Sequence, residues 1–317
     1  MRKGRFLFWI ISLVVCAIII IKYKEEEKKI PYEEKVPMNV YCMEEFQEKV
    51  KKIIEESSIG ENYKVVFTDN KEQAEFIFAD DVTNLNSNYK RVGWTPLIVA
   101  FDNNNTADKI KNYKEAEYLT EVSTSNGNSS YMIDFAKIIN DTIAGNWTDK
   151  IYCPNLDTLE GKLFFDFLII NINDGRYPED KEKLQKCIQK ADEFLNASSV
   201  VQLNAIERLQ NKKVVTNELY IIFENEIYNM KDSYYEFQIS YPTNTVAKEF
   251  YYCCKGENGK ELKELFQQET LTSEGNRLQD ILYNKRIRTD CHNNAYETNK
   301  YKESDGFSYV EIPLKEE

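Results

Sequence analysis

The chain has 317 residues, a formal net charge of -12 and 42% hydrophobic residues. That apolar content is enough to bury a core, which excludes a wholly disordered protein. The acidic balance argues against nucleic-acid binding, because nucleic-acid-binding proteins cluster Lys and Arg to neutralise phosphates. It also argues against a domain that lies flat on an anionic membrane surface. The length suits one two-lobed unit or two domains.

An uncharged apolar segment, residues 6–21, follows a basic tip at 1–5. As a helix it spans about 24 Å. The hydrocarbon core is thicker, at ~30 Å, but the flanking Lys22 can snorkel to its edge. We therefore predict a cytoplasmic tip at 1–5, a transmembrane anchor at 6–21 and a charged linker at 22–36. The basic tip favours an orientation that places the rest of the chain outside the cytoplasm.

Two alternatives for this segment stay open. A cleaved signal peptide needs small residues after the apolar run, whereas this run ends in isoleucines and then Lys22. A lipoprotein would be modified at Cys16, where such signals usually carry Gly, Ala or Ser in the preceding position. Val15 stands there instead. Both observations favour the uncleaved anchor.

Hydrophobic periodicity predicts strands and helices that alternate along the rest of the chain. Short apolar runs predict strands at 65–67, 76–79, 97–101, 219–223, 235–239 and 250–252. Apolar stripes predict helices that start near 43 and lie at 133–143, 159–168 and 184–195, and around 206–209, 262–266 and 278–282. Strands without polar interruptions are typical of a sheet that helices cover. The predicted fold class is α/β.

The sequence offers little catalytic chemistry. His292 is the only histidine, which excludes a multi-histidine metal site, and neither G-x-S-x-G nor a P-loop occurs. We therefore predict no catalytic residue, no metal, no cofactor and no enzyme activity. Six cysteines follow Cys16 without a C-x-x-C pair. Disulfide bridges and buried free thiols remain alternatives for them.

Several stretches, taken in order, resemble the type II periplasmic binding proteins of phosphate-binding type. They are FIFADD at 76–81, GWTPLIVAFDN at 93–103, GNWTD at 145–149, DTLEGKLFF at 157–165 and YPT at 241–243. The stretch 76–81 resembles a strand of that family that carries an Asp. The stretch 93–103 resembles the family's next strand, which ends in Asn at the point where the chain crosses to the second lobe. The fourth stands where the family carries an S-G-T helix start. The resemblance covers roughly residues 38–290.

The resemblance implies a two-lobed fold that follows the transmembrane helix. Lobe one would comprise 37–102 and 237–290, lobe two 103–236, and the C-terminal tail 291–317. A small molecule or an ion would lie in the cleft between the lobes. The candidate contacts are Tyr41, Asp80, Asp81, Thr158 and Tyr241. The partner would be a membrane permease, as in an ABC importer, or a sensor.

One departure from the family bears on the ligand. Glu160 places a carboxylate in the first turn of the helix after Thr158, where the family binds an anion. The adjacent carboxylates of Asp80 and Asp81 would also resist further negative charge. We therefore expect weak phosphate binding or none, and a cation or a hydrogen-bond donor as solute. The alternative function is a ligand-free interaction or sensory module.

Overall fold

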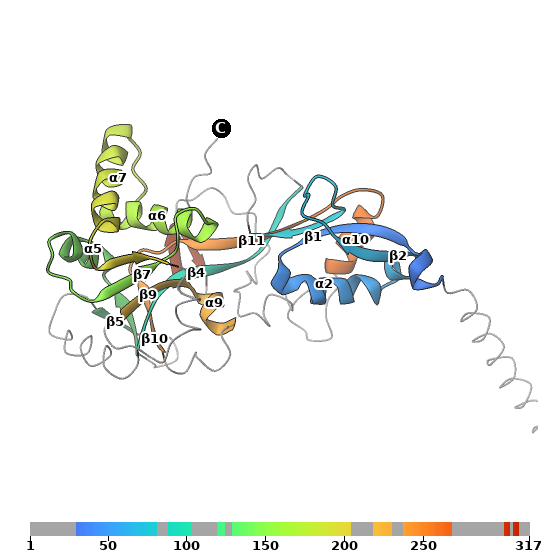
Figure 1. The fold of residues 1–317 in the computed structure, drawn as a ribbon, viewed down its shortest axis with the longest axis horizontal. Coiled ribbons are helices and arrows are strands. Elements are labelled where there is room, and N and C mark those ends of the chain that lie inside the picture. The colour runs from blue at the N-terminus through green and yellow to red at the C-terminus, as the bar shows by residue number, and fades with distance from the viewer. Residues whose placement is uncertain are drawn as a thin grey trace, which may run out of the picture. The chain divides into compact units, whose positions relative to one another are not determined.

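A computed structural model describes residues 30–80, 88–102, 119–123, 129–203, 218–229, 237–267, 301–304 and 307–310. These residues form two compact units, each of mixed α/β structure (Figure 1). Unit 1 contains 30–79 and 252–267, and unit 2 contains the described residues of 80–251 together with 301–304 and 307–310. Within unit 2, β12 (Tyr301–Ser304) and β13 (Phe307–Val310) pair antiparallel as a separate two-stranded sheet.

Unit 1 is a sheet with helices. Its elements are a 3-10 turn η1 (Tyr32–Glu34), β1 (Val36–Cys42), α2 (Glu44–Glu55), α3 (Ile59–Asn62), β2 (Tyr63–Phe67), β3 (Phe76–Ala79) and α10 (Gly259–Gln267). The end of β11 (Ala247–Cys254) completes a sheet of order β2-β1-β3-β11. Strand β1 pairs parallel with both β2 and β3.

The core of unit 1 is aromatic. Phe76 and Phe78 lie two residues apart on β3 and therefore project from the same face of the sheet. Phe46 of α2 meets Phe78 edge-on at 5.0 Å, and Phe266 of α10 stacks on Phe76 at 4.2 Å. Because α2 repeats its buried residues at Phe46, Val50 and Ile54, its apolar stripe faces this sheet.

Unit 2 is larger. Its strands are β4 (Lys90–Asp102), β5 (Leu119–Ser123), β6 (Ser129–Ile133), β7 (Lys150–Cys153), β8 (Val200–Gln202), β9 (Glu218–Phe223), β10 (Phe237–Pro242) and the start of β11. Its helices are α5 (Phe135–Ile143), α6 (Leu159–Ile172), α7 (Lys181–Leu195) and α9 (Glu224–Asn229). Strand β4 pairs antiparallel with β9 and β10, while β7 pairs parallel with β8 and β9.

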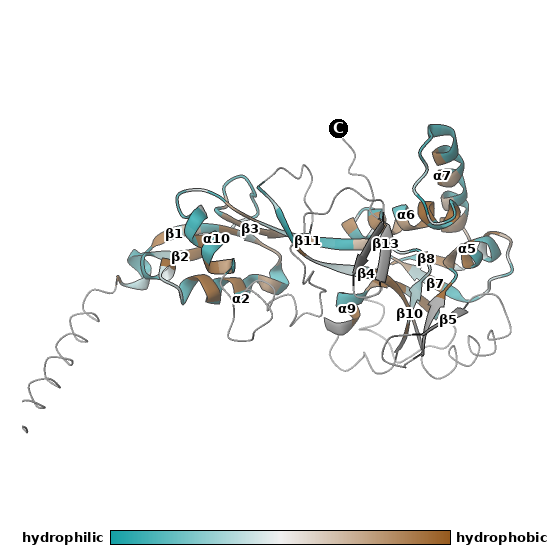
Figure 2. Cartoon of the chain, turned by 180° about the vertical axis from the view of Figure 1, so that it is seen from behind, coloured by the Kyte–Doolittle hydropathy of each residue, from teal (hydrophilic) through white to brown (hydrophobic). Residues whose placement is uncertain are grey.

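Helices α5, α6 and α7 share one core with the sheet of unit 2 (Figure 1). This core contains Leu97 and Val99 of β4 and the buried rings of Phe135, Phe167 and Phe194. The alternate residues of the same strands face the other way and pack with Ile227 of α9. Helix α6 is apolar on almost every side (Figure 2), as expected for a helix buried within its unit.

The chain passes from unit 1 to unit 2 at 79/80 and back at 251/252, and the described residues after 267 belong to unit 2 again. The sequence analysis placed these crossings at 102/103 and 236/237. The reason for the shift is the length of β4, which runs over thirteen residues and pairs with β9 and β10. These pairings bind β4 and β10 to unit 2.

Several sequence predictions fall outside the described residues. They are the anchor 6–21, the helices near 206–209 and 278–282, Cys16, Asp81, Cys291 and His292. Among the described residues, no helix is long and apolar enough to cross a membrane. No disulfide joins the described cysteines, which are Cys42, Cys153, Cys187, Cys253 and Cys254. Burial raises the pKa of the Cys42 and Cys153 thiols to about 12, so both are inert at neutral pH.

Candidate functional site

The most unusual group in unit 2 is a buried lysine among carboxylates. The Lys248 side chain, on β11, is only 6% exposed. Its Nζ lies 2.9 Å from Glu160 Oε1, 3.7 Å from Asp80 Oδ2 and 3.8 Å from Glu226 Oε1. We call these four residues the Lys248 cluster. It brings together β11, the first turn of α6, the first turn of α9 and the residue that follows β3.

The ammonium group of Lys248 also meets two aromatic rings. Its Nζ lies 5.2 Å from the ring centre of Phe223 and 5.9 Å from that of Phe250, both within reach of a cation–π interaction. Burial alone would lower the pKa of Lys248, but Glu226, Glu160 and Asp80 together outweigh it and raise that pKa. Lys248 is therefore a permanent cation, held by carboxylates and by π faces.

The start of α6 supplies Glu160 and carries a side-chain cap. Thr158 is the N-cap, and its Oγ1 accepts a hydrogen bond from the Gly161 N–H at 3.0 Å. The Asn155 carbonyl lies so close that a Cβ at Gly161 would come within 1.9 Å of its oxygen. This close approach requires glycine. The helix start that would bind an anion thus carries the protein's own carboxylate, neutralised by Lys248.

Helix α9 presents acids on two sides of the site. Glu226 Oε2 accepts the Phe223 N–H at 3.1 Å, which fixes this carboxylate beside Lys248. Glu224 is 5% exposed, and its Oε1 accepts the Tyr241 hydroxyl at 2.7 Å. Between them, Asn225 is 1% exposed, and its Oδ1 has no hydrogen-bond partner among the described residues. The region is therefore rich in acceptors.

The balance of charge follows directly. The four residues of the Lys248 cluster, three carboxylates and one ammonium, sum to two negative charges, and Glu224 is a further carboxylate nearby. Among the described residues, no group of three or more His, Cys, Asp or Glu could hold a metal ion. The arrangement suits an organic solute that donates hydrogen bonds, with or without positive charge.

A pH dependence follows from the Glu160–Lys248 pair. Burial tends to raise the pKa of Glu160, but its interactions with Lys248 outweigh this and hold it below the ordinary 4.5. The pair's stabilisation is therefore complete above that value and is lost as the pH falls through the lowered pKa. Lys248, with its pKa raised, contributes fully below its ordinary 10.5. We expect the stability difference between wild type and Glu160→Gln to be constant near neutrality and to shrink in acid. Chemical denaturation at several pH values would measure it, and a difference that grows in acid would contradict the pairing.

The structure places the predicted contacts in different surroundings. Asp80 joins the Lys248 cluster, and Thr158 caps the helix that carries Glu160. Tyr241 lies on β10 and binds Glu224. Tyr41 belongs to β1 of unit 1, where Lys71 Nζ lies 5.0 Å above its ring. Asp81 is outside the described residues. All five remain predictions as ligand contacts.

The sequence analysis missed Lys248, Glu226 and Glu224. A signal for Lys248 was present, because Val246, Lys248, Phe250 and Tyr252 alternate on the buried side of the chain around β11. A lysine in such an inward series needs a partner. No comparable signal marked Glu224 and Glu226, which start a helix of only six residues.

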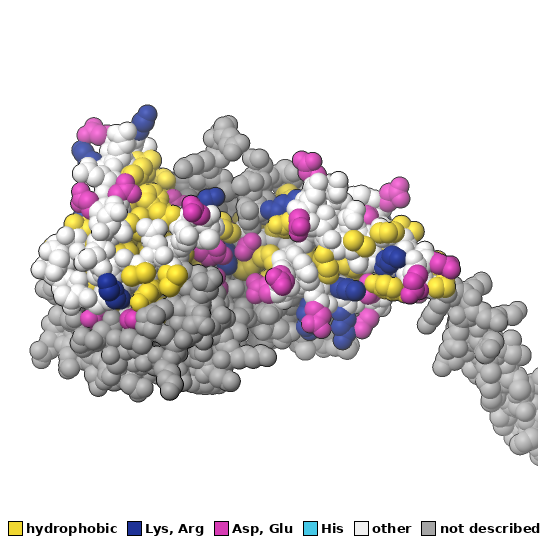
Figure 3. Space-filling view, viewed as in Figure 1, with side chains coloured by type: hydrophobic (Ala, Val, Ile, Leu, Met, Phe, Trp, Pro, Cys, Tyr) yellow, Lys and Arg dark blue, Asp and Glu magenta, His cyan; other side chains and the backbone are white. Residues whose placement is uncertain are grey.

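On the face drawn in Figure 3, acidic side chains are spread among basic ones over both units.

Comparisons with known proteins give structural matches alone. No protein-family model matches the chain, and no curated protein is significantly similar to it.

The similar solved structures include three of stated function. The sulfate-binding protein SubI from Mycobacterium tuberculosis H37Rv has a TM-score of 0.47 and 10% identity, over 80% of this chain and 86% of that one. A ferric binding protein from Campylobacter jejuni has a TM-score of 0.48 and 11% identity, over 82% and 88%. The periplasmic binding protein AfuA from Actinobacillus pleuropneumoniae, with fructose-6-phosphate bound, has a TM-score of 0.46 and 11% identity, over 80% and 84%. They belong to the class of protein that the sequence resembles, and their ligands differ from one another.

Proposed function

We propose that this chain is an extracytoplasmic binding protein that holds a small organic solute at the Lys248 cluster. The solute would contact the carboxylates of Asp80, Glu160 and Glu226. The observation that carries the proposal is the set of three carboxylates around one buried ammonium. A solute that donates hydrogen bonds or carries positive charge would relieve the excess of acceptors. The same carboxylates would repel phosphate or sulfate, because like charges at close range raise the free energy of binding.

The apolar segment 6–21 supports the further proposal that the protein is anchored by one helix in the cell membrane. The binding unit would then stay at the membrane and could deliver its solute to a permease, as for an ABC importer. The binding chemistry in unit 2 does not depend on this anchor, so the two proposals can fail separately.

A ligand-free interaction or sensory module is the second candidate. The observation that favours it is the Glu160–Lys248 contact at 2.9 Å, through which the protein fills its own anion position. If the Glu160 carboxylate permanently takes the place of a bound anion, the folded protein needs no solute at this position. The two candidates therefore differ in whether any solute raises the stability of the protein.

A thermal-shift screen would decide between them. The full-length chain, purified in detergent, would be screened with organic amines, guanidinium compounds, neutral polyols, phosphate and sulfate. We expect a rise in melting temperature with at least one donor-bearing solute and none with the two anions, because only ligands that bind the folded state stabilise it.

The matched variant for this screen is Asp80→Asn, which removes one carboxylate and leaves Lys248 paired with Glu160 and Glu226. It should weaken the shift that the best solute gives. If nothing in the screen stabilises the wild type, the ligand-free module becomes the better account.

A further inference from the structure

A short motif that the proposed function does not use recurs along the chain. The triplet Asn-x-Ser/Thr, in which x is not proline, is the acceptor sequence for N-linked glycans in secreted proteins. It occurs five times, and its asparagines are Asn104, Asn128, Asn140, Asn146 and Asn196. The first two lie outside the described residues, whereas the other three belong to unit 2.

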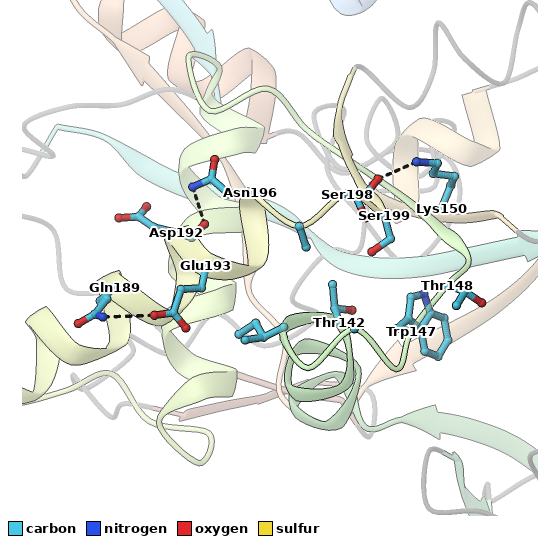
Figure 4. Close-up of a pocket in the computed structure, with 13 residues that line it drawn as sticks. Thr142, Trp147, Thr148, Lys150, Gln189, Asp192, Glu193, Asn196, Ser198 and Ser199 are labelled. Atoms are coloured by element: carbon cyan, nitrogen blue, oxygen red, sulfur yellow. Dashed lines mark hydrogen bonds between the residues drawn. The ribbon is translucent and has the colours of Figure 1, made fainter.

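These three triplets meet at one end of unit 2, although α6 and α7 separate them in the sequence. Asn140 lies on α5, and Asn196 is the C-cap of α7. Lys190 of α7 donates from its Nζ to Asn140 Oδ1 at 2.6 Å, which holds the two helices together at this end. Residues of the triplets at 146–148 and 196–198 line the same hollow, of about 960 Å³ (Figure 4). The fold thus gathers motifs that the sequence keeps apart.

The turn that carries Asn146 presents both groups that the motif requires. Gly145, with a φ of +75°, directs the chain away from the end of α5, and the Asn146 N–H donates to the Asp141 carbonyl at 2.8 Å. The middle residue, Trp147, is 8% exposed and packs in the core, which fixes the backbone. Asn146 and Thr148 are exposed on either side of it, and their side chains make no hydrogen bond with a described residue.

Asn196 offers a second acceptor, and Asn140 does not. Asn196 and Ser198 are both exposed. Asn196 Nδ2 donates to the Asp192 carbonyl at 2.8 Å, and a glycosylated amide nitrogen keeps one N–H that can still donate. In the triplet of Asn140, by contrast, the hydroxyl belongs to Thr142, which is 3% exposed. An enzyme that reads the motif has to reach the hydroxyl as well as the amide, because the motif requires both.

We propose that Asn146 and Asn196 carry N-linked glycans, which cover this end of unit 2. The donor is a sugar carried on a lipid diphosphate. The carboxamide nitrogen attacks the anomeric carbon of the sugar, and the bond from that carbon to the phosphate oxygen breaks. The lipid diphosphate leaves, and one amide proton passes to a base of the transferring enzyme. The proposal rests on the proposed extracytoplasmic location and does not involve the Lys248 cluster.

Translation of the full-length chain in the presence of endoplasmic reticulum microsomes tests this proposal. We expect slower bands on a gel, which treatment with peptide-N-glycosidase returns to the mobility of the unmodified chain. Asn146→Gln and Asn196→Gln should each remove one step of mobility, and Asn140→Gln should remove none. Thr148→Ala should act like Asn146→Gln although it keeps the asparagine. Thr148→Ser keeps the hydroxyl and should therefore keep the glycan.

Protease added outside the microsomes separates this proposal from the location on which it rests. If the chain is protected and either Asn146→Gln or Asn196→Gln leaves the bands unchanged, the proposed glycans are overturned and the extracytoplasmic location stands. If the protease digests the chain, the domain has not crossed the membrane, and both the location and the glycans are overturned. Solute binding at the Lys248 cluster is measured separately by the thermal-shift screen.

Discussion

Replacing Lys248 with methionine is expected to lower the free energy of unfolding by about 3 kcal/mol, because it leaves partly buried carboxylates without their counter-charge. The side chains of Asp80, Glu160 and Glu226 are 20%, 27% and 19% exposed, so solvent compensates each of them only in part. Urea denaturation followed by circular dichroism would measure the loss.

A matched control lies on α10. Lys260 pairs with Glu264 one helical turn away at 3.8 Å, but the two side chains are 89% and 65% exposed. Exposed pairs of this kind contribute roughly 0.5 kcal/mol or less, so Lys260→Met should be nearly neutral. Adding Glu160→Gln to Lys248→Met should recover part of the loss, since one repelling carboxylate is removed. If Lys248→Met costs no more than Lys260→Met, the Lys248 cluster is not an electrostatic unit.

Gly161→Ala is expected to destabilise the protein by about 2 kcal/mol, although alanine usually favours a helix. The added Cβ would lie 1.9 Å from the Asn155 carbonyl oxygen, and a backbone atom cannot move aside cheaply. Because Glu160 precedes Gly161, the displaced helix start would also move its carboxylate away from Lys248. Thermal unfolding would detect the loss of stability.

Gly259→Ala provides the comparison for this substitution. Gly259 is the first residue of α10, and a Cβ there would lie 3.4 Å from the Cys254 backbone, an ordinary contact. We expect it to be neutral or slightly stabilising. Equal effects of the two changes would show that the approach of Asn155 to α6 is looser than the structure describes.

The secondary structure followed from hydrophobic patterning where segments are long and regular. The stripe of α7 at Cys187, Ala191 and Leu195 and the unbroken apolar strand β3 were both predictable, because burial on one or two faces leaves a fixed period in the sequence. The boundary between the two units was harder to predict from the sequence. It depends on which strands pair, and β4 joins β9 and β10 through contacts more than a hundred residues apart in sequence.

The candidate site was only partly predictable for the same reason. Asp80 and Glu160 stood out because a strand end and a helix start are local features. Lys248 and Glu226 join them only through the tertiary fold, and sequence distance conceals such a meeting. The helix start at Glu160 could be placed from sequence, but its neutralisation by Lys248 could not, because the two residues are 88 positions apart.

Isothermal titration of ligands into the full-length chain tests the central claim most directly. Phosphate and sulfate should give no binding heat up to millimolar concentration, whereas the best donor-bearing solute of the thermal-shift screen should bind and should weaken about tenfold in Asp80→Asn. Glu160→Ser, which removes the carboxylate from the start of α6 and leaves Lys248 paired with Asp80 and Glu226, should gain measurable phosphate binding. Micromolar affinity of the wild type for phosphate, or an unchanged affinity of Asp80→Asn for the solute, would contradict the assignment of the Lys248 cluster as the binding site.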